Sequence, residues 1–287
     1  MITGKDVVLA SQKDLESLFI PEANFELKIE LDSSSRHHAS VVGTGKNLRI
    51  RFSKDFCSAE VADIDAFHFF ALIIGHEIAH YMHAHNEHND QTEFDSKSIE
   101  AFTDFFGTRV MMTLITYGQN YIGLYEKLGF KFHSGKVLDS IGTAIAKLSD
   151  SLFKTDSKNY PNCISRVGFC AAGVTSFLDK KFGNINIQRS MDALTRIYTA
   201  GNLPQLFKLQ SDEFDMDPDL IVRSDEVHKV IQGIKLSISQ GVKPQYFKYI
   251  GTSYHSTEQS REVYIETLIS LAKGQGFDLP KLTKKTI

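Results

Sequence analysis

Tryptophan is absent from the 287-residue chain, and proline and cysteine are scarce, with six and three residues respectively. The three cysteines (Cys57, Cys163 and Cys170) are too few and too far apart for a disulfide framework or a four-cysteine metal site. An odd number of cysteines in a chain of this length is typical of a reducing compartment. No stretch is rich enough in proline, glycine or serine to predict a linker. We therefore expect a cytoplasmic protein without disulfide bonds.

Long hydrophobic runs and a strong charge of one sign are also missing. The most apolar run, residues 66–75, has about half the length that a membrane span needs. The first residues lack the basic region and apolar stretch of a signal peptide. The net charge is −3 and the basic residues form no long stripe, which disfavours nucleic acid as the main partner. We expect neither a membrane span nor a nucleic-acid partner.

The N-terminal part of the chain has the pattern of a small β-sheet. Apolar residues make up 42% of the chain, which is a globular composition. Apolar and polar residues alternate over residues 25–31, which predicts a half-buried strand. Residues 39–52 predict two short strands joined by a Gly-Thr-Gly turn at residues 43–45.

Helical periodicity replaces the strand pattern from about Val61 onward. Asp63 or Asp65 is a candidate N-cap for a helix that runs to about His83, and a second helix is expected over residues 98–117. Further amphipathic helices are expected over residues 134–153, 162–180, 187–199, 224–239 and 257–273. The sequence therefore predicts an α+β fold with a small N-terminal sheet, a two-helix core and a helical C-terminal half.

Residues 76–80 read His-Glu-Ile-Ala-His, an HExxH motif. Residues four apart lie on one face of a helix, so His76 and His80 can bind the same zinc ion. Glu77 lies beside that face, where its carboxylate can act as a general base on a water molecule whose pKa zinc lowers to about 7. A buried glutamate beside two buried histidines would be costly without a metal. The motif therefore predicts a zinc hydrolase.

A catalytic zinc site needs a third protein ligand and one open position. The extended pattern HExxHxxGxxH fails, because His83 and Asn86 stand where it requires glycine and histidine. Glu100 lies twenty residues after His80, which leaves room for a loop and a returning helix. Asp104, one turn further, shares its face and could hydrogen-bond the outer nitrogen of a zinc-binding histidine.

A cysteine ligand is the alternative, since peptide deformylases combine HExxH with one. The residues around Cys57, DFCSAEV, do not match that family's cysteine motif. We therefore predict one zinc ion per chain, with His76, His80 and Glu100 as its ligands.

Other histidines lie close to the motif in the sequence. A second metal site at His83, His85 and His88 is one interpretation. His83 lies two turns from His76, about 10 Å along the helix axis, so we interpret these three as exposed histidines at a helix end. His68, two turns before His76, is expected to be a hydrogen-bonded core residue.

The HEIAH motif, followed by a helix with ExxxD and Gly107, resembles the gluzincins, zinc peptidases with two histidines and a glutamate as ligands. The segment EAFTDFFG (residues 100–107) is similar to the ExxxDxxG helix of the heat-shock and prenyl-protein endopeptidases. HExxH before a helical C-terminal half also resembles the Lit-type phage-exclusion peptidases, which cleave a host translation factor during phage infection. The resemblance covers about residues 60–117. It implies a zincin-like metallopeptidase core over residues 1–130 and a helical region over residues 131–287 that packs on it.

The segment YPNCISR at residues 160–166 is similar to a segment of the same families, a His-Pro pair with a downstream arginine. Tyr160 stands in place of the histidine. The likeness implies that Tyr160 or Arg166 stabilises the oxyanion of a tetrahedral intermediate. A helix start with a proline near its first turn is the alternative interpretation.

These features predict a zinc-dependent endopeptidase that cleaves a specific cytoplasmic protein, and the resemblance implies a role in phage defence or regulation. Glu77 would take a proton from water and pass it to the leaving amine. An edge strand within residues 39–52 would hold the substrate backbone in extended form. One alternative is a zinc amidohydrolase for a small molecule, which a closed pocket would favour. The other is a binding or regulatory protein with structural zinc, which a fourth protein ligand would favour.

Overall fold

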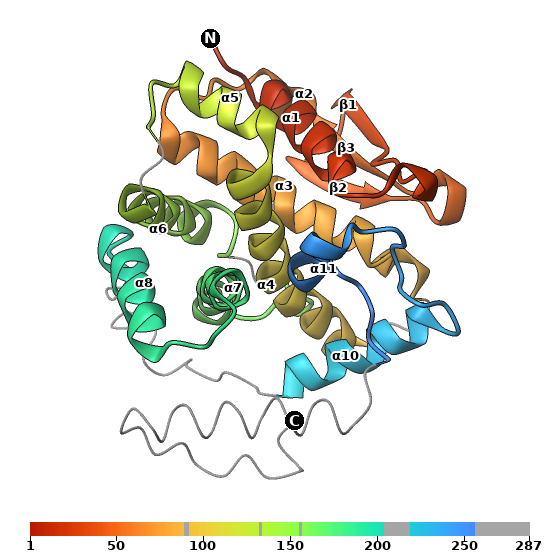
Figure 1. Cartoon of the computed structure of the whole chain (residues 1–287). Helices are drawn as coiled ribbons and strands as arrows, with labels where there is room; N and C mark the ends of the chain where they lie inside the picture. Colours follow the sequence, from red (N-terminus) through yellow and green to blue (C-terminus); the bar gives the residue numbers. More distant parts are fainter. Residues whose placement is uncertain (89–91, 132–133, 155–156, 204–218, 256–287) are drawn as a thin grey trace.

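A computed structural model describes residues 1–287 except residues 89–91, 132–133, 155–156, 204–218 and 256–287. The fold is α+β, as the sequence predicts. A three-stranded sheet lies in the N-terminal part of the chain, and helices make up most of the rest (Figure 1).

The sheet contains β1 (Ile29–Ser33), β2 (Ala39–Val42) and β3 (Arg49–Ser53) in the order β1-β3-β2. β2 and β3 pair antiparallel, which confirms the two strands predicted within residues 39–52. β1 pairs with β3 in parallel and begins later than the strand expected at residues 25–31.

That later start has a local cause at Leu27. Its backbone N–H donates to Glu16 over 2.9 Å and its carbonyl accepts from Gln12 over 2.8 Å. Both partners are side chains of α1 (Gly4–Ser17), so the backbone groups of Leu27 hydrogen-bond this helix instead of a neighbouring strand.

Helix α1 is a further difference from the sequence prediction, which contained no helix before Val61. It begins with a capping box between Thr3 and Asp6. Two other short helices were not predicted either, α2 (Lys54–Ser58) and α5 (Gln119–Lys127). The 3-10 turns are η1 (Pro21–Ala23), η2 (Gly45–Asn47) and η3 (His85–Glu87).

The two predicted motif helices are α3 (Ile64–Met82) and α4 (Glu93–Tyr117). Asp63 caps α3 as predicted, by accepting from the backbone N–H of Ala66 over 2.8 Å. The second helix was expected from about residue 98 to Tyr117; it ends at Tyr117 and starts earlier. Thr92 forms a capping box with Asp95, which starts α4 at Glu93.

Two glycines bring α3 and α4 together beside the motif. A Cβ atom added to Gly75 would lie 2.5 Å from the Gly107 carbonyl oxygen, and one added to Gly107 would lie 2.7 Å from that of Gly75. Real Cβ atoms do not make such contacts, so both positions require glycine. The close backbone approach lets a side chain on α4 reach two side chains on α3.

Helix α4 lies at the centre of the helical part and contacts α3, α7 (Cys163–Phe182), α10 (Asp219–Gln232) and α11 (Pro244–Ile250) (Figure 1). The remaining helices, α6 (Ser134–Ser151) and α8 (Ile187–Ala200), pack against each other. The helix expected at residues 224–239 is α10, which starts earlier and ends before Gly233, whose φ of +55° is left-handed. The helix expected at residues 257–273 lies outside the described residues.

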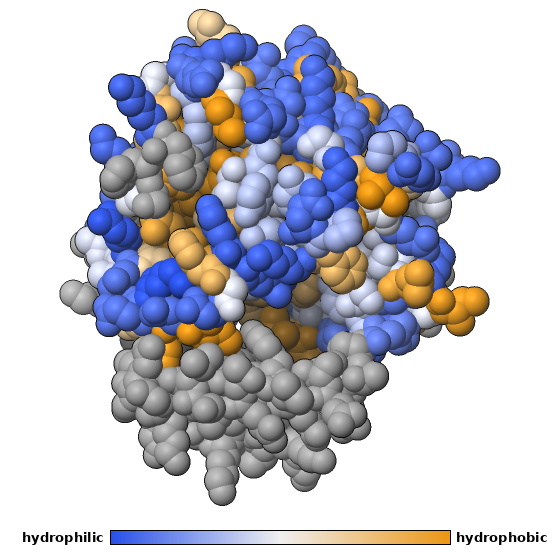
Figure 2. All heavy atoms as spheres, in the orientation of Figure 1, coloured by the Kyte–Doolittle hydropathy of each residue, from blue (hydrophilic) through white to orange (hydrophobic). Residues whose placement is uncertain are grey.

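One hydrophobic core extends from Ile2 to Ile250 and contains buried side chains of the sheet and of α3, α4, α6 and α7. On the face shown in Figure 2, hydrophilic side chains cover much of the described surface and hydrophobic ones lie in smaller areas between them. Within the described ranges, no helix is long and apolar enough to cross a membrane.

Candidate metal centre

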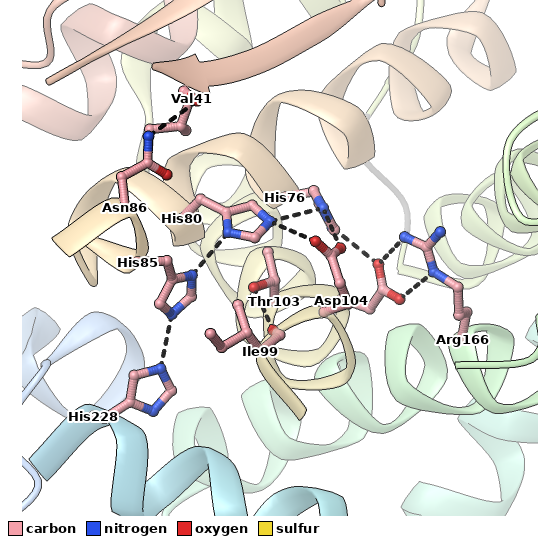
Figure 3. A network of polar contacts seen from close by, with 11 residues as sticks. Val41, His76, His80, His85, Asn86, Ile99, Thr103, Asp104, Arg166 and His228 are labelled. Carbon is pink, nitrogen blue, oxygen red and sulfur yellow. Dashed lines mark hydrogen bonds and ion pairs between the residues drawn. The ribbon is translucent and has the colours of Figure 1, made fainter. Parts of the chain in front are cut away.

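The three predicted ligands come together between α3 and α4. The Nε2 atoms of His76 and His80 lie 3.2 Å apart (Figure 3). The two oxygens of Glu100 lie 3.3 Å from His76 Nε2 and 3.5 Å from His80 Nε2. These three residues are the one group of His, Cys, Asp and Glu in the described part of the chain with ligand atoms within 4.8 Å of one another.

The spacing of these atoms fits a tetrahedral zinc ion. Bonds of about 2.0–2.1 Å at tetrahedral angles place ligand atoms roughly 3.3–3.4 Å apart. The observed separations of 3.2, 3.3 and 3.5 Å lie around that value. Glu100 Oε2 is buried and, apart from its ion-pair contact with His76 Nε2, has no hydrogen-bond partner among the described residues. A buried carboxylate oxygen without a donor is costly, whereas a cation would satisfy it.

The outer nitrogen of His76 is held by a charged pair. Its Nδ1 donates to Asp104 Oδ1 over 2.9 Å. Arg166, on α7, donates to the same carboxylate twice, from Nε to Oδ2 over 2.7 Å and from a terminal nitrogen to Oδ1 over 3.0 Å. Both Asp104 and Arg166 are buried. Asp104 therefore makes the hydrogen bond to His76 that the sequence predicted, and Arg166 holds that carboxylate in place.

Charge interactions outweigh burial at these groups. Burial alone would lower the pKa of His76, but Asp104 and Glu100 raise it to about 10. Burial alone would raise the pKa of Glu100, but His80 and His76 lower it. At Asp104, Arg166 and His76 likewise overcome burial and lower the pKa. Both carboxylates are therefore held in the ionised form that a metal site needs.

The outer nitrogen of His80 is held by other histidines. His80 Nδ1 lies 2.8 Å from His85 Nδ1, and His85 Nε2 lies 2.8 Å from His228 Nε2 (Figure 3). His83 stacks on His85 with ring centroids 5.4 Å apart. We call His83, His85 and His228 the histidine cluster. Burial is the main cause of a lowered pKa at all three members.

The sequence interpretation of exposed histidines at the helix end was wrong. His83 and His85 are buried, and His88 contacts Asp95 with Nε2 and Oδ2 3.2 Å apart. A left-handed residue, Ala84 (φ 49°, ψ 41°), turns the chain back after α3, so these side chains face the protein interior.

The expectation for His68 is confirmed. It is buried and hydrogen-bonds Ser140 and Tyr125, as its sequence position two turns before the motif had suggested.

Two cavities flank the candidate metal centre. One, of about 460 Å³, is lined by His76, Glu77, Asp104 and Arg166 together with apolar side chains that include Leu148, Leu152 and Phe153. We call it the apolar cavity. The other, of about 200 Å³, is lined mainly by polar residues, His80, His85, Asn86, Ser96, Glu100 and Asn159, and we call it the polar cavity.

Tyr160 lines both cavities, so it lies where they meet at the metal centre. Glu100 is the main cause that raises the pKa of Tyr160 to about 12, followed by burial and with a smaller contribution from Glu77. Its hydroxyl is therefore a hydrogen-bond donor at neutral pH. The ring of Tyr160 lies 5.0 Å from the guanidinium carbon of Arg166.

His228 is the residue that the sequence could not reveal. It lies 143 residues from His85, on a helix with no motif of its own, and only the packing of α10 on α4 brings it to the cluster. Cys57, the alternative ligand, is buried on α2 and does not belong to the group formed by His76, His80 and Glu100.

No protein-family model matches the chain, and comparisons with curated proteins and with solved structures find no match.

Proposed function

We propose that this protein is a zinc-dependent endopeptidase of the gluzincin type. The observation that carries the proposal is the arrangement of His76, His80 and Glu100, whose ligand atoms have the spacing of a tetrahedral site. No fourth His, Cys, Asp or Glu of the described residues joins this group, which favours a site with an open position over a closed structural one.

Glu77 is the proposed general base. Its half-buried carboxylate faces the apolar cavity next to His76. When bound, zinc polarises a substrate carbonyl and lowers the pKa of a water molecule to about 7. Glu77 takes the proton of the attacking water and carries it to the leaving amine, so the carboxylate ends the cycle as it began.

Tyr160 is the proposed donor to the oxyanion of the tetrahedral intermediate. Its hydroxyl keeps its proton at neutral pH, and its position between the two cavities places it beside any substrate that spans the centre. Arg166 is less suited to that role, because it binds both oxygens of Asp104. We assign Arg166 to holding Asp104, which in turn orients His76.

The free edge of β2 supports a substrate with an extended backbone. The His38 carbonyl accepts from Ser53 of β3, so by alternation the backbone groups of Ala39 face the open edge. Ala39 also lines the apolar cavity with Glu77. A peptide strand that paired with Ala39 would therefore pass the proposed base.

Asn86 limits how much of this edge is available. Its side-chain amide donates to the Val41 carbonyl over 3.2 Å and to the Gly43 carbonyl over 3.1 Å. The Val41 carbonyl lies on the open edge and is therefore already engaged. The short stretch that remains supports recognition of one particular peptide segment. A specific cytoplasmic protein as substrate, and a role in phage defence, are what the resemblance to the Lit-type peptidases implies.

A comparison of Glu77→Gln with the parent tests the proposal. Glutamine keeps the size of the side chain and removes the base, so both proteins should hold about one zinc per chain. Catalysis should fall by at least ~10²–10⁴-fold in the variant. Elemental analysis gives the zinc content, and mass spectrometry of protein termini in cells that express each form gives the cleavage.

Glu126→Gln is the matched control, because Glu126 is exposed on α5 and lines neither cavity. New protein termini that appear with the parent and with Glu126→Gln, but not with Glu77→Gln, would support the endopeptidase. Loss of zinc from Glu77→Gln would make Glu77 a ligand and overturn its assigned role. Retained zinc without new protein termini from the parent would leave the small-molecule amidohydrolase or the regulatory zinc protein.

A further inference from the structure

A continuous chain of three imidazoles runs from the metal centre to α10. It links His80 to His85 and His85 to His228 through nitrogen–nitrogen contacts of 2.8 Å each (Figure 3). Each contact has one nitrogen as the donor and the other as the acceptor, because two N–H groups or two lone pairs cannot bond. The proton positions of the three rings are therefore linked.

Only one direction of this chain allows His80 to bind a metal. A histidine that binds through Nε2 carries its proton on Nδ1. His80 Nδ1 then donates to His85 Nδ1, and His85 Nε2 donates to His228 Nε2. The reverse direction would place a proton on His80 Nε2, the atom that faces Glu100 and His76.

The end of the chain is buried in aromatic surroundings. The ring of His228 lies 4.2 Å from that of Phe102 and 4.6 Å from that of Tyr254, measured between centroids. Within the described residues, His228 Nδ1 has no hydrogen-bond partner. In the metal-binding direction this atom carries the last proton. The ring nitrogen of His228 that carries the proton therefore indicates which nitrogen of His80, two rings away, carries its proton.

The surrounding structure holds both ends of this row of three imidazoles in place. Ala84 adopts a left-handed conformation, which L-residues other than glycine rarely adopt, and thereby brings His85 under His80. At the other end, Arg223 of α10 donates to Asp95 at the start of α4. This ion pair anchors α10 next to His228.

We propose that His85 and His228 are positioning residues that hold the His80 ring with its Nε2 lone pair toward the metal centre. They do for His80 what Asp104 does for His76. The inference depends on the metal site of the proposed function and not on peptide cleavage. It makes helix α10 a part of the metal centre, although α10 supplies no ligand.

Atom-matched substitutions test the role of each ring. His85→Asn places an amide oxygen near the position of the histidine Nδ1, and His228→Gln places one near the position of Nε2, whereas leucine offers no acceptor at either site. His85→Leu should weaken zinc binding by ~10–100-fold, the usual effect of removing a group that orients a metal ligand. His85→Asn should bind more tightly than His85→Leu, and His228→Gln more tightly than His228→Leu. Competition with a chromophoric chelator measures these affinities.

Nitrogen NMR of the zinc-bound protein gives a readout that a merely structural role would not affect. We expect a proton on His80 Nδ1, scalar coupling across the hydrogen bond to His85 Nδ1, and a proton on His228 Nδ1. A zinc-bound protein with the His228 proton on Nε2 would overturn the inference, because the chain would then be interrupted.

The outcomes separate this inference from the proposed function. Leucine variants that bind zinc as tightly as the parent would overturn the inference and leave the peptidase intact. A parent that binds zinc with His80 held by His85 and His228, but that cleaves no protein, would overturn the peptidase and leave the inference intact. A parent that binds no zinc would overturn both.

Discussion

The two proposed ligand histidines have the same chemistry but are held in opposite ways. His76 is oriented by a buried ion pair, Asp104 with Arg166, and His80 by neutral imidazoles, His85 and His228. The first arrangement needs its groups charged, and the second needs them uncharged. The proposed metal centre therefore combines a charged and a neutral arrangement, and each should fail under different conditions.

The charged side depends on the pairing of opposite charges. A buried ion pair adds little to the free energy of unfolding when compared with an apolar pair of the same shape, but removal of one partner leaves an uncompensated buried charge. The neutral side depends on burial, which keeps imidazoles unprotonated and so able to accept hydrogen bonds. Acid should therefore disrupt the neutral side first, and single substitutions should damage the charged side more.

The largest expected effect is acid destabilisation of the metal-free protein. Burial lowers the pKa of His68 and His83 to about 3 and lowers that of His85 and His228 as well. As pH falls below about 6.5, the unfolded chain takes up protons at these sites while the folded chain does not. Four such sites reduce the free energy of unfolding by about 5 kcal/mol per pH unit.

Denaturant unfolding at pH values from about 6 down to 5, below the unfolded histidine pKa, measures this slope with metal removed. His76 should add little to it, because its pKa is raised in the folded protein and the ring is largely protonated in both states there. His68→Gln should reduce the slope by about one proton. An unfolding free energy that stays constant over this range would show that the buried histidines are protonated in the folded protein, and the neutral side would then be charged.

The second effect comes from breaking the charged side. Asp104→Ala leaves the buried guanidinium of Arg166 without its partner, which should cost about 3–5 kcal/mol of unfolding free energy. Zinc affinity should also fall, by ~10–100-fold. Replacing both residues, with Asp104→Asn and Arg166→Met, should restore much of the stability but not the zinc affinity.

His85→Leu provides the contrast, since it should lower zinc affinity with a much smaller loss of stability. Thermal unfolding of the metal-free variants and chelator competition measure the two quantities separately. Equal loss of stability in Asp104→Ala and His85→Leu would remove the distinction between the two sides.

The contact between Asp104 and His76 was predictable from the sequence, whereas the ion pair of Asp104 with Arg166 and the neutral side were not. His76, Glu77 and His80 lie within one motif, and the spacing of Glu100 and Asp104 follows from a returning helix. The helical period relates residues within one helix. No local rule relates His228 to His85 across 143 residues. The turn at Ala84, left-handed without a glycine, also gave no signal.

The N-terminal region shows the same limit. The pair β2 and β3 was predictable because its turn and alternation are local. Helix α1 was not predicted, although Thr3 and Asp6 form a capping box there. The capping pattern was the available signal. The start of β1 depended on contacts of Leu27 with α1, which only the tertiary structure contains.

The third prediction concerns Tyr160, which lies between the two sides. Tyr160→Phe removes the hydroxyl and should lower kcat by ~10²–10³-fold if that group donates to the oxyanion. Zinc affinity should not change, because Tyr160 is not a ligand. Tyr117→Phe is the control, since the Tyr117 hydroxyl contacts Tyr249 and lines neither cavity. An unchanged kcat in Tyr160→Phe would show that another group donates to the oxyanion.

The smallest expected effect concerns the substrate side chains that the two cavities accept. The apolar cavity beside His76 has walls that include Leu152 and Phe153, whereas residues of the polar cavity beside His80 include Ser96 and Asn159. Peptides with a large apolar side chain next to the cleaved bond, on the side of the apolar cavity, should be preferred. One methylene group in such a pocket changes kcat/KM by about 10–200-fold. Leu152→Ala should therefore shift the preference toward larger side chains, measured as the ratio of kcat/KM for matched peptides. Ser96→Ala, in the other cavity, should leave that ratio unchanged, and an equal shift in both variants would mean that the cavities do not act as separate subsites.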